Sequence, residues 1–194
     1  MIHSKGLETG LRDKLNSELI VRKLYLCYPT YAFIGEDINY DIQFEIFNSI
    51  SEFFDIPITS IKVAGSGQTG YSYHKKKEFE VGKSDLDIAI IDLSLYNKYI
   101  EICYNNTNGL RDYTKFRDQD TFKQYCKNLA RGLFRPDLMP RCKEKSEWFE
   151  YFGKLSEKYF KEFKNINAGI YASQKFFEHK QAESIDKYLD GGKL

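Results

Sequence analysis

One short segment, residues 85–91, constrains the fold of this chain more than any other. It reads Asp-Leu-Asp-Ile-Ala-Ile-Ile. Because it is short, sharply bounded and rich in β-branched side chains, it predicts a β-strand. Side chains alternate along a strand, so the apolar Leu86, Ile88 and Ile90 should face the core. Asp85 and Asp87 should then stand together on the opposite side, about 7 Å apart.

The segments before this strand predict a helix, another strand and a turn. Asp37 is a candidate N-cap for a helix that Pro57 would end. Residues 60–64, Ser-Ile-Lys-Val-Ala, predict a short β-strand. Residues 65–70, Gly-Ser-Gly-Gln-Thr-Gly, predict a turn, because small residues and glycines interrupt regular structure. Residues 71–83 lack a helical period and predict a long, exposed hairpin loop.

The remaining segments are predicted to be mostly helical. Residues 8–27 predict a first helix, and the chain beyond Asp92 predicts further helices, one capped by Asp120 and one starting near Glu144. A last strand is expected at 165–171, before a helix capped by Ser173. We therefore expect one α/β (α+β) domain over 1–194, a small mixed β-sheet flanked by helices. Its core would span about 37–172, with helical extensions at 1–36 and 173–194.

Composition narrows the function classes. The 194 residues are 42% hydrophobic and 16% aromatic, enough to build a core, and carry a net charge of +1. A neutral total argues against coating nucleic acid by bulk charge, so any polyanion site must be local. No apolar run approaches bilayer length and no signal peptide is recognisable, so we expect a cytoplasmic protein without a membrane partner. Four cysteines, none in a CxxC pair, indicate buried thiols rather than a zinc site.

The chemistry should lie where the Gly-Ser turn and the Asp-x-Asp strand meet. Two close carboxylates repel each other unless a cation lies between them, and Mg²⁺ suits hard oxygen ligands combined with phosphate oxygens. Glycines let phosphate oxygens approach backbone N–H groups, and the Ser66 hydroxyl adds a donor. Together these features predict a site for a nucleoside triphosphate with magnesium.

With Gly65-Ser66 and Ser84-Asp85-Leu86-Asp87 in this order, residues 40–91 resemble the nucleotidyltransferase superfamily typified by DNA polymerase β. The run from Gly65 to Ser72 looks most like small bacterial nucleotidyltransferase-like proteins, some of them encoded in toxin–antitoxin or phage-defence loci. The resemblance implies a nucleotidyltransferase-like fold and transfer of a nucleoside monophosphate from a triphosphate to a hydroxyl, with release of pyrophosphate.

The resemblance also assigns roles to residues. Asp85 and Asp87 would be catalytic and would hold two Mg²⁺ ions, or Mn²⁺ in their place. Ser66, with the backbone of Gly65 and Gly67, would bind the β- and γ-phosphates. The acceptor is left open as RNA, a protein or a small molecule, and the short chain favours a protein partner or a homo-oligomer.

The third carboxylate of active superfamily members is missing from its expected place. The only later β run carries Asn165 and Asn167 on its non-core face, so an amide, with Asn167 as the metal-ligand candidate, would replace an acid. Asp92 and Asp112 are the candidate substitutes. This departure keeps open a second function, a nucleotide-sensing or regulatory subunit that does not catalyse transfer.

Basic residues offer further phosphate contacts. The stretch between Ser66 and Asp85 is longer than in most superfamily members, and it contains the basic residues His74, Lys75, Lys76 and Lys77. This stretch is either a flap over a triphosphate or RNA, or simply a solvated loop. Arg131 and Arg135 would share a face if the helix before them continued, and Arg135 could bind a phosphate; surface ion pairs are the alternative. A third function, an RNA-binding module, rests on this lysine cluster and the many tyrosines.

Overall fold

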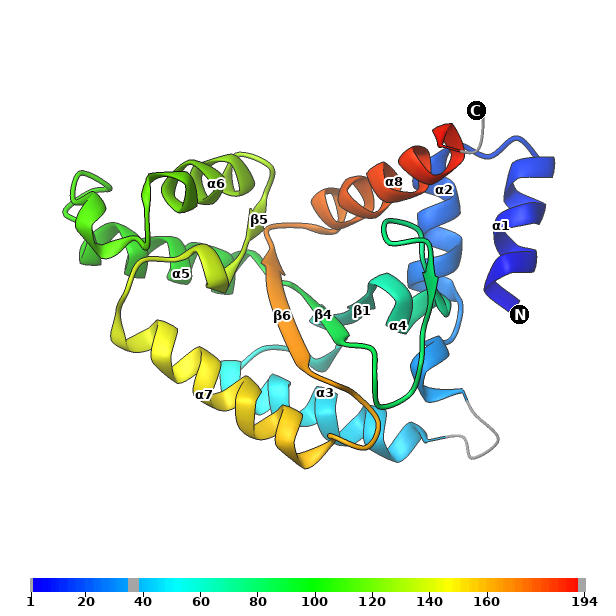
Figure 1. The fold of residues 1–194 in the computed structure, drawn as a ribbon, viewed down its shortest axis with the longest axis horizontal. Helices are drawn as coiled ribbons and strands as arrows, with labels where there is room; N and C mark the ends of the chain where they lie inside the picture. The colour runs from blue at the N-terminus through cyan, green and yellow to red at the C-terminus, as the bar shows by residue number, and fades with distance from the viewer. Residues whose placement is uncertain (1, 35–38, 192–194) are drawn as a thin grey trace.

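A four-stranded mixed sheet lies at the centre of the molecule (Figure 1). The structure, a computed structural model, describes residues 2–34 and 39–191. The strands are β1 (Ile61–Ala64), β4 (Leu86–Ile91), β6 (Ile166–Tyr171) and β5 (Leu133–Phe134), in that spatial order. β4 runs antiparallel to β1 and parallel to β6, and β5 is antiparallel to β6. A separate hairpin pairs β2 (Tyr71–Ser72) with β3 (Lys77–Glu78).

Helices make up most of the rest of the described chain. The α-helices are α1 (Ile2–Arg12), α2 (Ser17–Val21), α3 (Tyr40–Phe54), α4 (Gly65–Thr69), α5 (Leu93–Asn106), α6 (Gln119–Leu129), α7 (Lys143–Lys158) and α8 (Gln174–Asp190). A π-helical segment, η1 (Arg22–Cys27), continues α2. Single 3₁₀ turns occur at Tyr31–Phe33, Ile58–Ser60, Tyr113–Lys115 and Pro136–Leu138.

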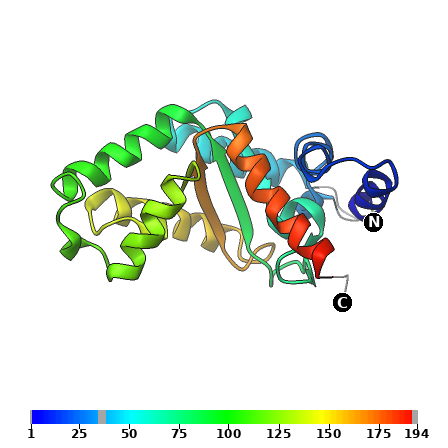
Figure 2. The same ribbon diagram turned by 90° about the horizontal axis from the view of Figure 1, so that it is seen from above.

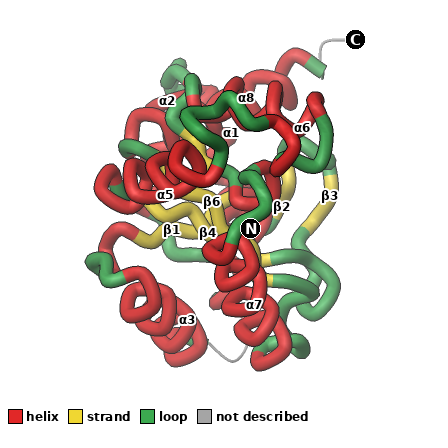
Figure 3. Tube along the Cα trace, turned by 90° about the vertical axis from the view of Figure 1, so that its left-hand side faces the viewer, coloured by secondary structure: helices red, strands yellow, loops and turns green. Residues whose placement is uncertain are grey.

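Each face of the sheet packs against its own set of helices. Leu86, Ile88 and Ile90 alternate along β4 and are buried among apolar residues of α3, α5 and α7. The other face, including Ala89 and Tyr171, is buried against α2, η1 and α8. Figures 2 and 3 show β4 and β6 enclosed between these layers. The N-terminal helices α1 and α2 and the C-terminal helix α8 therefore contribute to the second core, on the face of the sheet that carries Ala89.

The predicted sheet strands are confirmed, and so is the mixed α/β class. The strands expected at 60–64, 85–91 and 165–171 are β1, β4 and β6. The helix expected before Pro57 is α3, while its proposed cap, Asp37, lies outside the described residues. The predicted hairpin at 71–83 is confirmed by β2 and β3. The short strand β5 was not predicted, because two residues pairing with β6 leave no periodic signal.

The single helix predicted over 8–27 is wrong. Helix α1 ends at Arg12, and Lys14 has a φ of 55°, which breaks the helical path. Helix α2 then starts anew because the Asn16 side chain accepts a hydrogen bond from the Leu19 backbone N–H at 2.9 Å. Leucines on both sides of the break continue the same apolar spacing, which hides the break in the sequence.

Smaller corrections concern a cap and the cysteines. Asp118, not Asp120, caps α6, accepting a hydrogen bond from the Thr121 backbone N–H at 2.6 Å. Ser173 does occupy the N-cap position of α8, without a capping side-chain hydrogen bond. The expectation of buried thiols holds fully only for Cys103, since Cys27 is exposed. Within the part of the chain that is described, no helix combines the length and apolar character needed to cross a bilayer.

Candidate active site

The glycine-rich segment after β1 forms helix α4 rather than the predicted turn. Gly65 starts this single helical turn with a φ of 59°, and Gly70 ends it with a φ of 76°. Both conformations favour glycine, because a Cβ atom clashes in the left-handed region. Gly67 is buried, and a Cβ there would lie 3.1 Å from Val63 and 3.2 Å from Leu86. The glycines thus let the backbone leave β1 sharply and pack closely on β4.

Gln68 anchors α4 to the N-terminal segment. Its side chain is 2% exposed. The amide nitrogen donates to the carbonyl oxygens of Leu24 at 2.9 Å and Tyr28 at 3.1 Å. The amide oxygen accepts a hydrogen bond from the Thr30 hydroxyl at 2.9 Å. Every part of this buried amide has a partner, and α4 is thereby fixed to the end of η1.

Asp87 lies at the meeting point of three strands. On β4 it is the register partner of Ala64 on β1 and of Asn167 on β6. Register partners on neighbouring strands point to the same face of a sheet, so Asn167 stands beside Asp87. A Cβ at Gly65 would lie 3.2 Å from Asp87 Oδ2, which places the start of α4 against the same carboxylate.

Asp85, just before β4, is positioned by the other asparagine of the last strand region. The Asn165 side-chain nitrogen donates to Asp85 Oδ1 at 2.8 Å. The two asparagines predicted to replace the third carboxylate therefore contact or face the two aspartates. The resulting donor set is two carboxylates and two amides.

Electrostatics at this edge of the sheet favour a bound cation. Asp87 is accessible to solvent, yet protein encloses it in a hollow. This desolvation, reinforced by the nearby Asp85 charge and opposed by Lys75, raises the pKa of Asp87 to about 6. A divalent cation between the carboxylates would relieve both the desolvation and the repulsion. In the described ranges, no group of three or more His, Cys, Asp or Glu side chains is placed to hold a metal ion, so Asp85 and Asp87 would need amide and substrate oxygens.

Asp87 forms part of two adjoining hollows. The first, which we call the large cleft, measures about 620 Å³. Its lining includes Gly65, Asn167, Tyr171, Arg135 and Lys180. Aromatic and cationic groups thus share one cavity beside the carboxylates, a combination suited to a ring carrying phosphates.

The second, the basic hollow, measures about 170 Å³ and lies on the other side of Asp87. Ser66, Ser72, Lys75 and Lys164 line it together with Asp85. Two further lysines of the hollow, Lys77 and Lys83, form ion pairs with Glu80. Neither Lys75 nor Lys164 forms an ion pair among the described residues, so both charges are available to an anion.

The remaining predicted candidates lie elsewhere or are already paired. Asp92 caps α5 through the Leu95 backbone N–H at 2.7 Å, and Asp112 accepts from the Thr114 N–H at 2.9 Å, so neither replaces the third carboxylate. Arg135 lines the large cleft but forms a two-point ion pair with Asp137. Arg131 forms an ion pair with Glu183. The helix face that the two arginines would share does not exist, because α6 ends at Leu129.

Sequence reasoning missed several cleft residues. Lys180, Gln181 and Ser184 line the large cleft, and Lys164 lines the basic hollow. His74, which the sequence places in the basic loop, also lines the large cleft. Lys180, Gln181 and Ser184 lie on α8, and Lys164 lies just before β6. Only the docking of these elements beside β4 brings them to Asp87. No local pattern marks them, although Lys164 directly precedes the asparagines singled out above.

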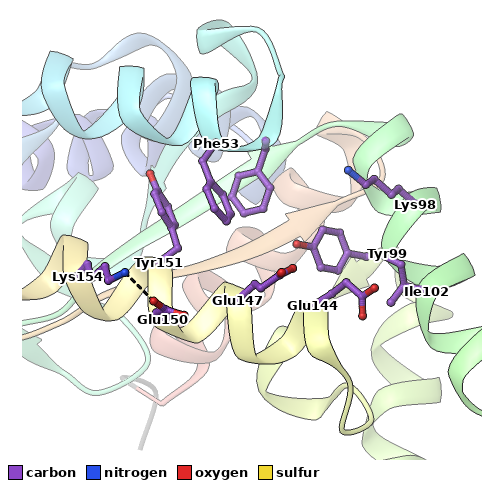
Figure 4. A pocket seen from close by; sticks show the side chains of 10 residues that line it. Phe53, Lys98, Tyr99, Ile102, Glu144, Glu147, Glu150, Tyr151 and Lys154 are labelled. Carbon is purple, nitrogen blue, oxygen red and sulfur yellow. Dashed lines mark hydrogen bonds and ion pairs between the residues drawn. The ribbon is translucent and has the colours of Figure 1, made fainter.

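A further hollow of about 500 Å³ lies on the opposite side of the sheet, between α3, α5 and α7 (Figure 4). Phe53 and Tyr151 stack there with ring centroids 3.9 Å apart. Its charges are largely paired, as in the ion pair between Lys154 and Glu150 at 2.6 Å. It contains neither of the two aspartates, so the candidate active site is the pair of hollows around Asp87.

Comparisons with known proteins give no relative for this site. No family model, no curated protein and no solved structure matches the chain.

Proposed function

We propose that this chain is a Mg²⁺-dependent nucleotidyltransferase that transfers a nucleoside monophosphate from a triphosphate to a hydroxyl. The observation that carries the proposal is the position of Asp87, between the basic hollow and the large cleft and beside Asp85. A triphosphate lying in the basic hollow and a nucleoside in the large cleft would bring the α-phosphate next to both carboxylates. The resemblance of residues 40–91 to nucleotidyltransferases supports the same fold and reaction.

The donor set fits a hard divalent cation. Asp85 and Asp87 would hold Mg²⁺, or Mn²⁺, and the Asn167 amide oxygen could add a neutral ligand. When bound, the metal supplies charge neutralisation for the phosphate oxygens and for the leaving pyrophosphate. Asn165 keeps Asp85 in place through its 2.8 Å hydrogen bond.

The side chains of the basic hollow would bind the phosphates. Ser66 and Ser72 donate hydroxyl hydrogen bonds, and Lys75 and Lys164 supply positive charge. In the reaction the acceptor oxygen bonds to the α-phosphorus, and the bond to the bridging oxygen of pyrophosphate breaks. The acceptor must also lose its proton. Asn167 cannot accept that proton because it is an amide, so the proton would pass to water or to the carboxylates Asp85 and Asp87.

Asn167 favours a second candidate function, binding of a nucleoside triphosphate without transfer. An amide opposite Asp87 lowers the negative charge of the site and removes a base. Such a protein would act as a nucleotide-sensing or regulatory subunit.

Incubating the purified protein with α-labelled triphosphates, Mg²⁺ and a panel of acceptors tests the proposal. We expect labelled acceptor and released pyrophosphate, both lost on chelation of the metal. Asp120→Asn, on the exposed surface of α6, is the matched control and should keep full activity. Triphosphate binding without pyrophosphate release would favour the second function, and absence of Mg²⁺-dependent binding would contradict both.

An Asn167→Asp variant should increase the transfer rate. A carboxylate beside Asp87 adds a metal ligand and a base, and a well-placed base contributes roughly 100-fold or more. Pyrophosphate release measured at saturating Mg²⁺ gives the rate. A rate equal to or below that of the wild type would show that residue 167 does not face the reacting groups. Asn165→Asp would repel Asp85 and serves as the unfavourable comparison.

A Gly65→Ala variant should weaken binding of the metal–triphosphate complex. The methyl group would lie 3.2 Å from Asp87 Oδ2 and would force a non-glycine residue into a φ of 59°. The backbone strain alone is about 1 kcal/mol. Calorimetric titration with a non-hydrolysable triphosphate should show at least a tenfold weaker affinity, whereas an unchanged affinity would place the ligand away from Gly65.

A further inference from the structure

A groove beside the candidate active site takes no part in the proposed binding of the triphosphate. It measures about 400 Å³ and lies between α7 and the segment that enters β6. It shares Phe149, Phe152 and Asn167 with the large cleft and Lys164 with the basic hollow. The groove therefore adjoins both hollows that contain Asp87, and its Asn165 side chain donates a hydrogen bond to Asp85.

Gly153 marks this groove as a place of close approach. It lies inside helix α7, where glycine costs stability relative to alanine because it fixes a flexible backbone. A Cβ built there would have no atom within 4 Å, so no packing in the described structure requires glycine. The missing side chain leaves the helix backbone open to a ligand in the groove.

Two exposed aromatic rings flank this opening. Phe149, on α7, is 47% exposed, and Phe160, just after the end of α7, is 65% exposed. Large apolar rings exposed around a cavity are typical of binding surfaces rather than of an inert surface. Flat rings of this kind stack on nucleobases without selecting among them.

Charge and polarity favour a nucleotide over an apolar peptide side chain. Lys164 lies between the groove and the basic hollow, where it can pair with a phosphate of the ligand. Ser156 and the two asparagines offer hydrogen-bonding groups at the inner end. Among the described residues that line the groove, Glu157 is the one carboxylate, and it suits an exocyclic amine or a sugar hydroxyl.

We propose that this groove is the acceptor subsite, in which a terminal unpaired base of single-stranded nucleic acid stacks on Phe149 or Phe160 against Gly153. The inference rests on the proposed transfer reaction and names its acceptor. The terminal sugar hydroxyl would then lie at the Asn167 end of the groove, where it faces the α-phosphate. DNA and RNA share this stacking chemistry, and the 2′-hydroxyl distinguishes them.

Oligonucleotide binding measured by fluorescence anisotropy tests this subsite without requiring turnover. The probes are short fluorescein-labelled single strands of RNA and DNA, with Mg²⁺ present and no triphosphate. Phe160→Ala should weaken binding about tenfold, as expected for loss of one stacking partner. Gly153→Leu should weaken it at least as much, because leucine fills the groove, and should also raise the Tm by about 2 °C through better helix formation. That rise would show that the loss is not caused by unfolding.

Phe44→Ala is the matched control. Phe44 is 60% exposed on α3 and lines none of the hollows described above. It should leave oligonucleotide affinity within twofold. Stronger binding of RNA than of DNA would assign a role to the 2′-hydroxyl, and equal binding would assign recognition to the base and phosphate; both outcomes support the subsite.

Triphosphate binding, measured separately by calorimetry, keeps this inference apart from the proposed function. All three variants should bind the metal–triphosphate complex as the wild type does. The acceptor subsite is wrong, and the transferase proposal survives, if the wild type binds triphosphate but no oligonucleotide. The same conclusion follows if Gly153→Leu and Phe160→Ala bind the oligonucleotide as tightly as the wild type does. Labelling of a hydroxyl-bearing peptide in place of the oligonucleotides would likewise overturn it. If the wild-type protein does not bind the metal–triphosphate complex, the proposed transferase function is itself refuted.

Discussion

An Asp87→Asn variant is expected to lose the proposed nucleotide transfer by about a thousandfold or more, because one of the two proposed charged metal ligands disappears where several kcal/mol of charge stabilisation are needed. The same substitution should stabilise the fold near neutral pH. Burial and the Asp85 charge raise the pKa of Asp87 to about 6, so its ionised form is disfavoured in the folded state. Activity and stability should therefore change in opposite directions.

The pH dependence of this stability difference has a definite sign. Because the folded-state pKa lies above the unfolded value of 3.8, the destabilisation by Asp87 is absent below about pH 4. It grows as the pH rises towards 6 and stays constant above. Since the carboxylate remains accessible to water, we expect a difference of about 1 kcal/mol at pH 7 rather than the full effect of the shift.

Thermal denaturation of wild type and variant at pH 4 and pH 7.5 measures this difference. Mg²⁺ should raise the Tm of the wild type at pH 7.5 and leave that of Asp87→Asn unchanged, because a ligand stabilises only the state that binds it. Asp120→Asn should follow the wild type in every condition. A variant less stable than the wild type at pH 7.5 would contradict the electrostatic description of the site.

A Gln68→Ala variant is expected to lose about 3 kcal/mol of folding stability. The substitution removes a buried amide and leaves two carbonyl oxygens and one hydroxyl without their partner. Such groups cannot easily be rehydrated at a site that is 2% exposed. A loss of this size lowers the Tm of a chain of this length by about 8 °C.

Urea titration of Gln68→Ala beside Gln124→Ala provides the test. Gln124 is exposed on α6, so its substitution should change stability little. Gln68→Glu keeps the size but replaces the donor with a charge beside two carbonyl oxygens, and should be at least as damaging. If Gln68→Ala were no less stable than Gln124→Ala, the N-terminal segment would not be fixed through this amide.

The sequence predicted the parts of the fold that have local signals. Strand β4 has a branched apolar pattern, and its two aspartates could be placed from alternation alone. The position of Asn167 near the aspartates could be predicted from a single assumption, that the last strand lies beside β4. The structure confirms that β6 pairs with β4, and the register places Asn167 opposite Asp87. Alternation fixes which face a residue occupies once the strand is known.

Features that depend on distant contacts could not be predicted. Helix α4 forms because Gly65 and Gly67 let it pack on β4, which a run of glycines read in isolation does not reveal. The break before α2 depends on the Asn16 cap within an unbroken leucine spacing. The cleft lining from α8 required knowledge of where the C-terminal helix docks. Caps and short strands are weak local signals that tertiary packing decides.

The parallel pairing of β4 with β6 also has a consequence for biosynthesis. Helices α5, α6 and α7 lie between Ile91 and Ile166, so all three must be synthesised before β4 can acquire its second neighbour. Until then a ribosome-bound chain would present one edge of its most apolar strand, with unpaired backbone groups available to other chains. Long-range pairing of this kind folds slowly. We therefore expect chains truncated before β6 to aggregate or to require chaperones, and the candidate site around Asp87 to remain incomplete until β6 has been synthesised.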